Sequence, residues 1–347
     1  MLKTEYYQDL ADFVQTEIMG QQKRVRPQEP TTPTRQEILD CFKSAGWKET
    51  FQGARPFRRS FSPIDNSTCV YMVDGKLYRH SQTIDRIAKR KDLTRRFLDA
   101  NRVPIPVGAD FSLDEHDAAS LYFSGLDKTV ITKPSNLGGS RGVTVGINSP
   151  ERFNQGWLKA SKAKGAKRIL VEEHIRGIEL RLFVIGDAVA AAAARVQPFI
   201  VGDGKKSISE LVAAENEIRA HNFRHRNHPI VPDSSFLSDQ GYEPSTTVPT
   251  DQVVFLSPLT VLSAGAINVD VSNSISDDVK KLAVRAAKAI PTLEIAGVDI
   301  LIKNLQNAQT AKVIEINTAP AIDIHRFPSI GDPVDLPKLM VDHFLQA

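Results

Sequence analysis

The segments AGVDILI (residues 296–302) and IEIN (residues 314–317) decide how this chain folds and what chemistry it can carry. Both are short apolar-rich runs, which are typical of strands, and the short connection between them predicts an antiparallel hairpin. Side chains at i and i+2 of a strand share one face. We therefore expect Glu315 and Asn317 to point the same way, with Asp299 of the partner strand facing them.

Two carboxylates and an amide oxygen on one sheet face are the hard oxygen ligands that Mg²⁺ prefers. Acids on the covered side of a sheet are costly unless they are paired or bind a metal. A metal site is the favoured interpretation, and a solvent-facing polar stripe is the alternative. Four apolar side chains are expected to cover the opposite face of the hairpin: Ile300, Ile302, Ile314 and Ile316.

A glycine-rich stretch, ITKPSNLGGSRGV (residues 131–143), lies upstream between two predicted strands. Glycines let backbone N–H groups approach a polyphosphate closely, and Lys133 on the preceding strand supplies a positive charge. The stretch is not a Walker loop, because no Gly-Lys-Ser/Thr follows the glycines, and a strand rather than a helix follows it. On its own it is interpreted equally well as a phosphate loop or as a flexible turn.

The stretch VEEHIRGIELR (residues 171–181) follows as a strand end that opens into a short connection. Free backbone donors and acceptors there suit the edge of a purine, and a carboxylate a few residues on can accept two ribose hydroxyls. Taken alone, however, a solvated charged strand edge is the favoured interpretation.

The remaining periodicities predict alternating helices and antiparallel strands, which indicates an α+β fold. A capping box is predicted at Thr34 and Glu37, an N-cap at Ser149, and a hairpin turn at Asp74-Gly75. Residues 21–34 are interpreted as a linker. The expected helices cover residues 1–20, 35–45, 85–98, a segment from 150 onward, 207–220, 277–290 and 335–345. The expected strands cover residues 68–73, 76–78, 129–132, 143–147, 168–171, 181–185, 188–196, 297–302 and 311–316.

Composition excludes several classes of protein. The chain has 347 residues, of which 41% are hydrophobic and 24% charged, and a net charge of +3, so global disorder and binding to nucleic acid by net charge are not indicated. Its two cysteines cannot form a disulfide framework, which favours the cytoplasm. The N-terminus lacks the apolar core of a signal peptide, and the longest apolar run, residues 188–194, is too short to span a bilayer.

Other candidate sites carry less weight. The stretch HNFRHRNH (residues 221–228) has three histidines, for which a solvated loop is favoured over a zinc site. The basic stretch 86–96 lacks aromatics for stacking on nucleic acid, and a helix that brings Lys91 near a phosphate is favoured. Cys41 and Cys69 have no histidine at a recognisable spacing, so a catalytic thiol is not expected.

Taken together in chain order, these motifs resemble the ATP-grasp superfamily, most closely the ATP-grasp module of cyanophycin synthetase and of the bifunctional glutathione synthetases. The likeness covers about residues 80–345 and is carried by six stretches: residues 91–106, 131–143, 171–196, 201–212 (VGDGKKSISELV), 296–302 and 314–333 (IEINTAPAIDIHRFPSIGDP). It implies an α+β ATP-grasp fold that holds the nucleotide between two α+β subdomains, with an extra N-terminal region. The implied boundaries are 1–85 for that region, 86–128 for a segment leading into the core, 129–178 for the lid subdomain and 179–347 for the C-terminal subdomain with the metal site.

The resemblance also implies a role for each matched residue. The residues implied at the ATP phosphates are Lys91 and Lys133, with Ser140, Arg141 and Gly142 as a lid over them. Those implied at the nucleoside are Glu172, Glu173, His174 and Ile175 for adenine, and Glu179 for ribose. Asp299, Glu315 and Asn317 are implied as ligands of two Mg²⁺ ions, with Mn²⁺ as a substitute. Arg195, Lys133 and Arg141 are implied in catalysis, with Arg195 near the γ-phosphate and the acyl phosphate.

The implied activity is an ATP-dependent, ADP-forming carboxylate–amine ligation through an acyl phosphate. The implied substrates are a small-molecule carboxylate and an amine, amino acids or a short peptide. No nucleic-acid or membrane partner is implied, and a homo-oligomer is left open. Two alternatives remain: an ATP-grasp kinase that phosphorylates a small molecule, and a nucleotide-binding protein without ligase activity. The loop at residues 261–266 reads VLSAGA where cyanophycin synthetase has NLSTGG, so a shared acceptor site does not follow from the resemblance.

Overall fold

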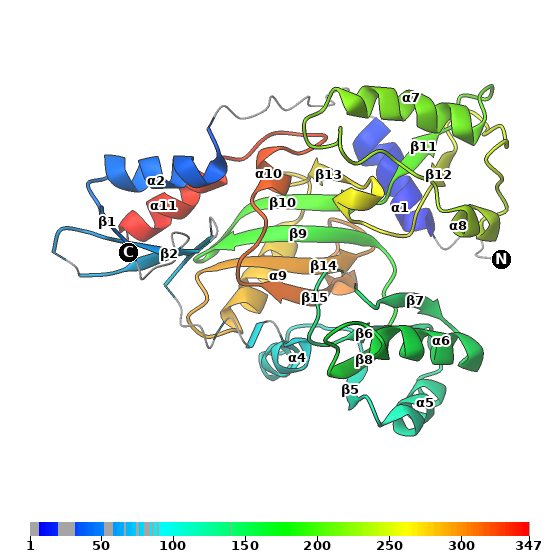
Figure 1. Ribbon diagram of the computed structural model, residues 1–347, viewed down its shortest axis with the longest axis horizontal. Coiled ribbons are helices and arrows are strands. Elements are labelled where there is room, and N and C mark those ends of the chain that lie inside the picture. Colours follow the sequence, from blue (N-terminus) through cyan, green and yellow to red (C-terminus); the bar gives the residue numbers. More distant parts are fainter. Residues whose placement is uncertain are drawn as a thin grey trace.

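The computed structural model describes the chain as several ranges: 7–19, 32–51, 58–65, 67–73, 76–79, 84, 87–88, 90–139 and 141–346. Within these ranges helices alternate with antiparallel sheets, which confirms the α+β class predicted from the sequence (Figure 1). None of the helices described there is long and apolar enough to cross a membrane.

A five-stranded sheet forms the centre of the molecule. Every neighbouring pair of its strands is antiparallel. Its strands, in spatial order, are β13 (Ile267–Asp270), β10 (Ala188–Val196), β9 (Ile178–Ile185), β14 (Ile295–Ile302) and β15 (Lys312–Asn317). The expected hairpin of residues 296–302 and 314–317 is therefore confirmed as β14–β15, at one edge of this sheet.

The two faces of the central sheet differ in character because side chains alternate along each strand. One face is apolar and packs against helix α9 (Asp277–Lys288) and the N-terminal helical segment. That segment consists of α1 (Gln8–Phe13), which continues as a π-helix, η2 (Val14–Met19). The opposite face is polar at its centre and apolar at one end, where Phe183 and Ala191 join a second core.

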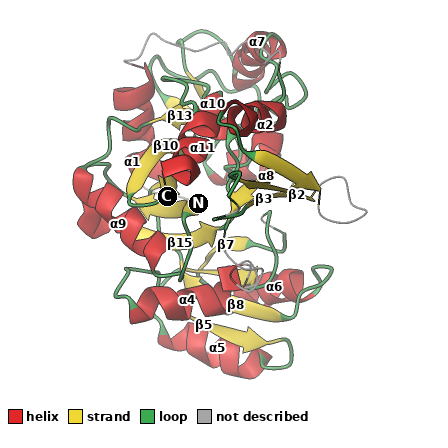
Figure 2. Cartoon of the chain, turned by 90° about the vertical axis from the view of Figure 1, so that its left-hand side faces the viewer, coloured by secondary structure: helices red, strands yellow, loops and turns green. Residues whose placement is uncertain are grey.

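A four-stranded antiparallel sheet forms a separate body with its own small core (Figures 1 and 2). We call this body the lid subdomain. Its strands are β5 (Gly108–Ser112), β8 (Arg168–Glu173), β6 (Val130–Pro134) and β7 (Thr144–Ile147), and its helices are α5 (His116–Gly125) and α6 (Pro150–Ser161). The predicted cap of α6 is confirmed, since Ser149 Oγ accepts a hydrogen bond from the Arg152 amide and Pro150 is the first helical residue.

The N-terminal region packs against the C-terminal helix. Helix α2 (Thr34–Ser44) lies beside α11 (Leu336–Gln346), and both cover the apolar end of the polar sheet face. A small antiparallel sheet shares this second core. Its strands are β1 (Lys48–Phe51), β2 (Arg58–Ser62), β3 (Val70–Val73) and β4 (Lys76–Tyr78).

The rest of the chain surrounds the edge of the central sheet at β13. A two-stranded sheet with its own core lies there. The elements of this part are β11 (Phe199–Val201), β12 (Val253–Phe255), α7 (Ile208–Ala220), α8 (Ser234–Asp239) and η3 (Leu262–Ala264). Three further helical elements are α4 (Lys91–Ala100), η4 (Ala308–Thr310) and α10 (Asp323–Arg326).

Some local predictions were wrong. The capping box at Thr34 does not form, because Arg326 donates to Thr34 Oγ1 (2.6 Å) and pairs with Glu37 (2.5 Å), which takes both side chains away from the helix end. The basic helix expected over residues 85–98 is interrupted: Ile87 and Ala88 are helical, Arg90 is extended, and α4 begins at Lys91. The predicted turn at residues 74–75, most of the linker at 21–34 and residues 85, 86 and 89 lie outside the described ranges.

Candidate active site

The polar face of the central sheet gathers charged side chains from four neighbouring strands. Antiparallel register sets Arg195 of β10 opposite Glu179 of β9, Arg181 of β9 opposite Asp299 of β14, and Asp299 opposite Glu315 of β15. Directly opposed residues of antiparallel strands point to the same face. The pairing therefore brings three carboxylates and two guanidinium groups together on one surface, which we call the polar face.

Asp299 is at the centre of the polar face. It is 2% exposed and is held by Arg181, which donates from Nε to Oδ1 and from NH2 to Oδ2 (2.8 Å), while Arg195 lies 3.3 Å from Oδ2. Burial alone would raise the pKa of Asp299, but Arg181 and Arg195 outweigh it and hold the pKa below its usual value. Asp299 is therefore a carboxylate at any physiological pH.

The other two predicted metal ligands flank Asp299. Asn317 Nδ2 lies 3.4 Å from Asp299 Oδ2, and Glu315 Oε1 accepts a hydrogen bond from Lys91 Nζ (2.9 Å). The expectation that Asp299, Glu315 and Asn317 share a face thus agrees with the register. The expectation for Ile314 was wrong, because a register shift between Asp299 and Ile300 leaves Ile314 out of the pairing and puts Val313 into the core instead.

Arg195 links Asp299 to Glu179 on β9, the strand that follows the lid subdomain. Its guanidinium pairs with Glu179, whose second oxygen accepts a hydrogen bond from Thr260. Burial would lower the pKa of Arg195, but the carboxylates of Asp299 and Glu179 outweigh it and raise that pKa. Arg195 Nε is buried without a hydrogen-bond partner among the described residues, which leaves one donor of the guanidinium unsatisfied.

The residues at the polar face fit a divalent cation. Across the described ranges, no three His, Cys, Asp or Glu side chains form a metal-binding group, and the candidate set is two carboxylates and one amide. These are oxygen donors of the kind that Mg²⁺ takes when phosphate oxygens complete its ligands. Glu315 uses one oxygen for Lys91, and its side chain is 35% exposed, so it is the most accessible of the three carboxylates on the polar face.

A second cluster of charges lies inside the lid subdomain. Glu172 of β8 is 1% exposed and pairs with Lys133 of β6 and with Arg95 of α4 (2.8 Å). Lys133 is expected at the ATP phosphates, and here it is held by Glu172. Glu172, which is expected to line the adenine, has its side chain buried against Lys133 and Arg95.

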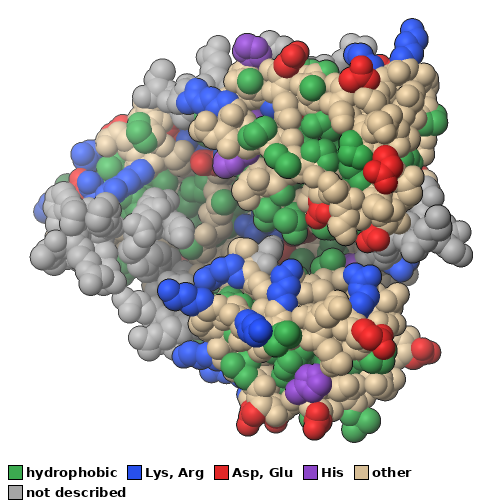
Figure 3. Space-filling view, turned by 45° about the vertical axis from the view of Figure 1, so that its right-hand side comes forward, with side chains coloured by type: hydrophobic (Ala, Val, Ile, Leu, Met, Phe, Trp, Pro, Cys, Tyr) green, Lys and Arg blue, Asp and Glu red, His purple; other side chains and the backbone are tan. Residues whose placement is uncertain are grey.

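Helix α4 joins the two charge clusters. The Lys91 amide donates to the Ser135 carbonyl at the end of β6 (3.0 Å), while the Lys91 side chain reaches Glu315 of the central sheet. Figure 3 shows a groove between the lid subdomain and the rest of the molecule, with lysine and arginine side chains along its rim on the lid side. Positive charge at the rim favours an anionic ligand such as a polyphosphate.

The connection from β8 to β9 joins the lid subdomain to the central sheet. The amides of Glu173 and His174 already donate to Val107 O (2.7 Å) and Thr129 O (2.9 Å). Among the described residues, the Ile175 amide has no hydrogen-bond partner, so it is the donor that remains for a purine edge. Burial and Arg176 lower the pKa of His174 to about 4, so its ring is neutral at pH 7.

The remaining residues predicted at the site, Ser140, Arg141 and Gly142, belong to the glycine-rich loop. Arg141 donates from Nε to Gly138 O (3.1 Å) and is exposed, and among the described residues no hydrogen bond or ion pair joins it to the polar face. A side chain at Gly142 would be crowded by Pro134 and Ala163, both 3.0 Å away, so the loop packs closely against the end of β6. Ser140 lies outside the described residues.

Several residues at the site were not singled out from the sequence. Arg181 could have been found, because it is two residues from Glu179 on the same strand and must share its face. Gln197, two residues beyond Arg195, donates to Pro258 O (2.9 Å), and its Oε1 is buried without a partner among the described residues. Arg95 and Thr260 could not have been found, because only the three-dimensional packing brings them to Glu172 and Glu179.

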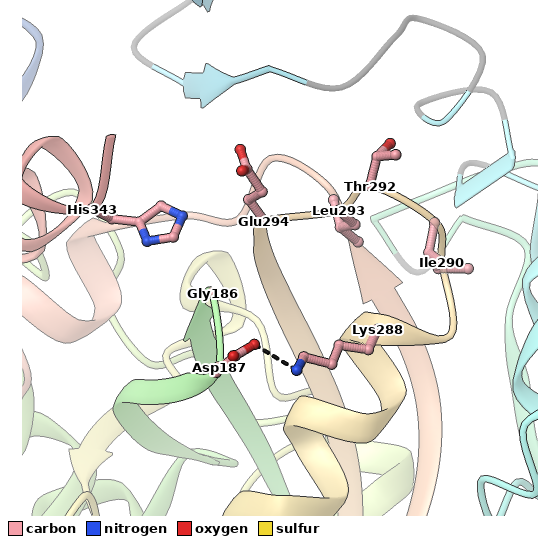
Figure 4. Close-up of a pocket in the computed structure, with 8 residues that line it drawn as sticks. All are labelled: Gly186, Asp187, Lys288, Ile290, Thr292, Leu293, Glu294 and His343. Atoms are coloured by element: carbon pink, nitrogen blue, oxygen red, sulfur yellow. Dashed lines mark ion pairs between the residues drawn. The ribbon is translucent and has the colours of Figure 1, made fainter. Parts of the chain in front are cut away.

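A surface hollow of about 480 Å³ lies at the other end of β9 and β10 (Figure 4). It surrounds the turn at Gly186 and Asp187 and contains the ion pair between Asp187 and Lys288 (2.5 Å). Glu179 is six residues from the end of β9 at Ile185, which is about 20 Å along a strand. This hollow is therefore separate from the polar face.

Comparison with known proteins gives related sequences and a related structure. No protein-family model matches the chain. It is 28% identical over 319 residues to a glutathione biosynthesis bifunctional protein of Desulfotalea psychrophila, covering 89% of this chain and 38% of the relative. It is 27% identical over 280 residues to the cyanophycin synthetase of Synechocystis, covering 78% of this chain and 32% of the relative.

The crystal structure of a bifunctional glutathione synthetase from Pasteurella multocida superposes with a TM-score of 0.62 at 24% sequence identity, covering 90% of this chain and 43% of that one. The chain thus spans about two fifths of the length of the relatives it matches, and the match to a solved structure extends over nearly all of the chain.

Proposed function

We propose that this chain, which has the ATP-grasp fold and is related to the bifunctional glutathione synthetases and cyanophycin synthetases, is an ATP-dependent carboxylate–amine ligase that forms ADP. One observation carries the proposal: Asp299, Glu315 and Asn317 converge on one face together with Arg181, Arg195 and Lys91. Such a face can bind a phosphoryl group and stabilise the charge that moves during its transfer.

The proposed reaction has two steps. An oxygen of the substrate carboxylate attacks the γ-phosphorus of ATP, the bond from that phosphorus to the bridging oxygen breaks, and ADP leaves. The amine then attacks the carbonyl carbon of the acyl phosphate, the C–O bond to phosphate breaks, and the proton lost by the amine leaves with the phosphate. No side chain on the polar face is assigned as a general base.

The chain's own residues orient and stabilise these groups. Arg195, whose Nε has no partner among the described residues, would hold the transferred phosphoryl group, and Lys91 and Lys133 would hold the phosphates that precede it. Bound Mg²⁺ would supply positive charge at the phosphates, and Asp299, Glu315 and Asn317 are the residues that would hold it. The loop with Arg141 and Gly142 is assigned to cover the phosphates and exclude water, which would otherwise hydrolyse the acyl phosphate.

The nucleoside is assigned to the connection between the two sheets. The Ile175 amide would donate to the purine edge, and Glu173 and His174 would border it. Glu179 would take the ribose if it released one oxygen from Thr260 or Arg195. Amino acids or a short peptide are proposed as substrates. The two described cysteines are both free thiols, which is compatible with a reaction in the cytoplasm.

The proposal is tested by measuring ADP release from Mg-ATP across pairs of amino acids and weighing the products by mass spectrometry. A ligase gives a product that has lost one water relative to the two substrates. Adding hydroxylamine in place of the amine distinguishes the alternatives, because only an acyl phosphate gives a hydroxamate. A phosphorylated hydroxyl product would indicate a kinase, and ATP binding with no turnover for any pair would indicate a nucleotide-binding protein.

A further inference from the structure

A cavity of about 280 Å³ lies beside the edge of the central sheet, between helix α7 and strand β13. We call it the α7 cavity. Its volume is at the lower end of small-molecule sites, which are about 300–1,000 Å³, so it suits an amino acid rather than a nucleotide. The residues that line it are Pro198, Phe199, Glu215, Ile218, Arg219, Asn222, His225, Ile230, Gly265, Ile267, Ser329 and Ile330.

One end of the α7 cavity is rich in hydrogen-bond donors. Arg219 is 4% exposed, and its NH2 donates to His225 Nδ1 (3.0 Å). Because arginine can only donate, His225 Nδ1 must accept, and the proton of the neutral ring is on Nε2. That Nε2–H donates to Ser329 Oγ (2.9 Å). Burial and Arg219 lower the pKa of His225 to about 3, so this tautomer persists at pH 7.

The hydroxyl of Ser329 is then left as a donor. Its oxygen accepts from His225 Nε2 and from the Asn268 amide (3.4 Å), so both of its acceptor positions are used. Its O–H proton is the remaining group, and it belongs to a residue that lines the cavity. The Ser329 hydroxyl on one side of the His225 ring and the Arg219 guanidinium on the other are both groups that hold a carboxylate.

The α7 cavity borders the same strand as the polar face. The amide of Ser329 donates to Asn268 O (2.7 Å), and Asn268 stands directly opposite Arg195 in the β10–β13 register. A ligand held at Ser329 is therefore separated from Arg195 by one intervening strand, β13, which is two interstrand spacings of about 4.8 Å, or about 10 Å between backbones. The ligand thus binds within about 10 Å of the residue proposed to hold the transferred phosphoryl group.

The remaining walls of the α7 cavity are apolar. They are formed by branched side chains from α7, from β13 and from the two loops that face them: Ile218, Ile230, Ile267 and Ile330. Gly265 shapes this wall, because its φ is +91° and a Cβ there would lie 2.8 Å from Ile230 Cγ1. Walls of this kind disfavour a second carboxylate on the ligand, because burying an unpaired charge is costly.

We propose that the α7 cavity binds the amine substrate of the ligation as an α-amino acid with an apolar side chain. Its carboxylate is held at Arg219 and Ser329, its side chain lies among the four isoleucines, and its amino group stays free to attack the acyl phosphate. This inference rests on the proposed function for the role of the ligand, and it concerns a cavity that the polar-face residues do not line.

The test is isothermal titration calorimetry of the full chain with single amino acids, with and without a non-hydrolysable ATP analogue. L-Leucine and L-phenylalanine are expected to bind, and L-aspartate and glycine to bind at least tenfold more weakly, since removing an apolar side chain from such a pocket costs about 1–3 kcal/mol. N-acetyl-L-leucine should bind about as well as L-leucine, because its carboxylate is intact. L-Leucinamide should bind at least tenfold more weakly.

Two variants locate the ligand. Ile218→Trp should abolish leucine binding by filling the cavity from α7, where residue 218 is 46% exposed and a larger side chain is tolerated. Ala213→Trp is the matched control, because it adds the same ring at an exposed position of the same helix that does not line the cavity. Ser329→Ala should weaken leucine binding about tenfold, which is about 1.4 kcal/mol.

The inference is overturned if no apolar amino acid binds in either nucleotide state, if L-aspartate binds as well as L-leucine, or if Ile218→Trp binds leucine normally. Its failure is distinguishable from failure of the proposed function. Leucine binding that Ile218→Trp removes, in a chain that never releases ADP, would leave the cavity assignment standing and refute the ligase. ADP release with an amine that binds equally well to the Ile218→Trp variant would support the ligase and refute the cavity assignment.

Discussion

Arg181 and Asp299 face each other on neighbouring strands and make two hydrogen bonds at the centre of the polar face. The pair is buried, with side chains 9% and 2% exposed. A buried ion pair adds little net stability because both charges lose their water, but removing one partner leaves an uncompensated charge. Asp299 thus does two things in the proposed enzyme: it holds two arginines in place and offers oxygen to a cation.

Glu315→Gln should abolish turnover while leaving the fold intact. Glu315 is a more informative position than Asp299, because its side chain is 35% exposed and, within the described ranges, it forms an ion pair with Lys91 alone. Removing its charge weakens the proposed cation site and should lower kcat for ADP release by about 10²–10³-fold, or about 2.7–4 kcal/mol. The measurement is steady-state ADP release at saturating Mg²⁺, with a urea unfolding curve to show that stability is kept.

Asp278→Asn is the matched control for this change. It replaces an exposed carboxylate by its amide on α9, which covers the opposite face of the sheet. Near-normal turnover is expected from it. Near-normal turnover from Glu315→Gln as well would show that the metal assignment is wrong.

Lys133→Met should raise the apparent KM for ATP and lower kcat, because a lysine on phosphate acts in both the ground state and the transition state. It should also lower the free energy of unfolding, by about 1–3 kcal/mol, since Glu172 loses one of its two cationic partners while 1% exposed. Steady-state kinetics and urea unfolding measure the two effects separately.

The double variant Lys133→Met/Glu172→Gln separates the causes. Its unfolding free energy should recover, because the buried charge is gone, while its ATP kinetics stay as poor as in the single variant. If both recover, Lys133 acts only by neutralising Glu172, and the glycine-rich loop has no phosphate role through it.

The β14–β15 hairpin was predictable from two short apolar runs with a short connection, and the sharing of one face by Asp299, Glu315 and Asn317 was predictable from the two-residue alternation of a strand. The same rule gives Arg181 from Glu179 and Gln197 from Arg195, although neither was singled out. The alternation of side chains along a strand does not predict a register shift, and for this reason Ile314 was wrongly placed in the core. A bulge is set by the partner strand rather than by the local pattern.

Contacts between segments far apart in the chain could not be predicted from the sequence either. Thr34 and Glu37 have the pattern of a capping box, yet Arg326, almost 300 residues away, takes both side chains. The histidine-rich stretch 221–228 was interpreted as a solvated loop, and this was wrong for His225, which is 4% exposed between Arg219 and Ser329. Tertiary partners decide such cases, and one sequence does not reveal them.

The stability of the chain should fall as the pH drops below about 6.5, in part because of His325. This residue is 2% exposed, and burial together with Arg181 lowers its pKa to about 3. An unfolded histidine takes up a proton near pH 6.5, whereas the folded one stays neutral. Stability is therefore complete above pH 6.5 and is lost towards pH 3, by up to about 1.4 kcal/mol per pH unit for this one group.

Urea unfolding between pH 6 and pH 4.5 measures this slope. His325→Gln should be less stable than the parent chain at pH 7, but its stability should fall less steeply with pH. His221→Gln, at an exposed position of the histidine-rich stretch, is the control and should keep the parent slope. Equal slopes in the parent and His325→Gln would contradict a neutral, buried His325.

Limited trypsin digestion should cut the free chain after Arg141, and Mg-ATP should protect that bond. Arg141 is exposed, and its only hydrogen bond given among the described residues is to Gly138 within its own loop. A Cβ at Gly138 or Gly139 would meet no atom within 4 Å, so this part of the loop packs against little else. Phosphates would give the loop amides and Arg141 partners and so order it. Equal cleavage with and without Mg-ATP would count against a phosphate lid.

The same loop is assigned to keep water from the acyl phosphate, and its two glycines make this testable by substitution. Gly139 has a φ of +66°, which an alanine adopts only with strain, whereas a positive φ is not recorded for Gly138. The pair Gly138→Ala and Gly139→Ala therefore forms a matched comparison. Gly139→Ala should hinder closure and raise the ratio of ATP hydrolysis to ligation several-fold, and Gly138→Ala should change it much less. The ratio is read from phosphate release and amide product in the same reaction. If both variants keep the parent ratio, the loop does not shield the intermediate.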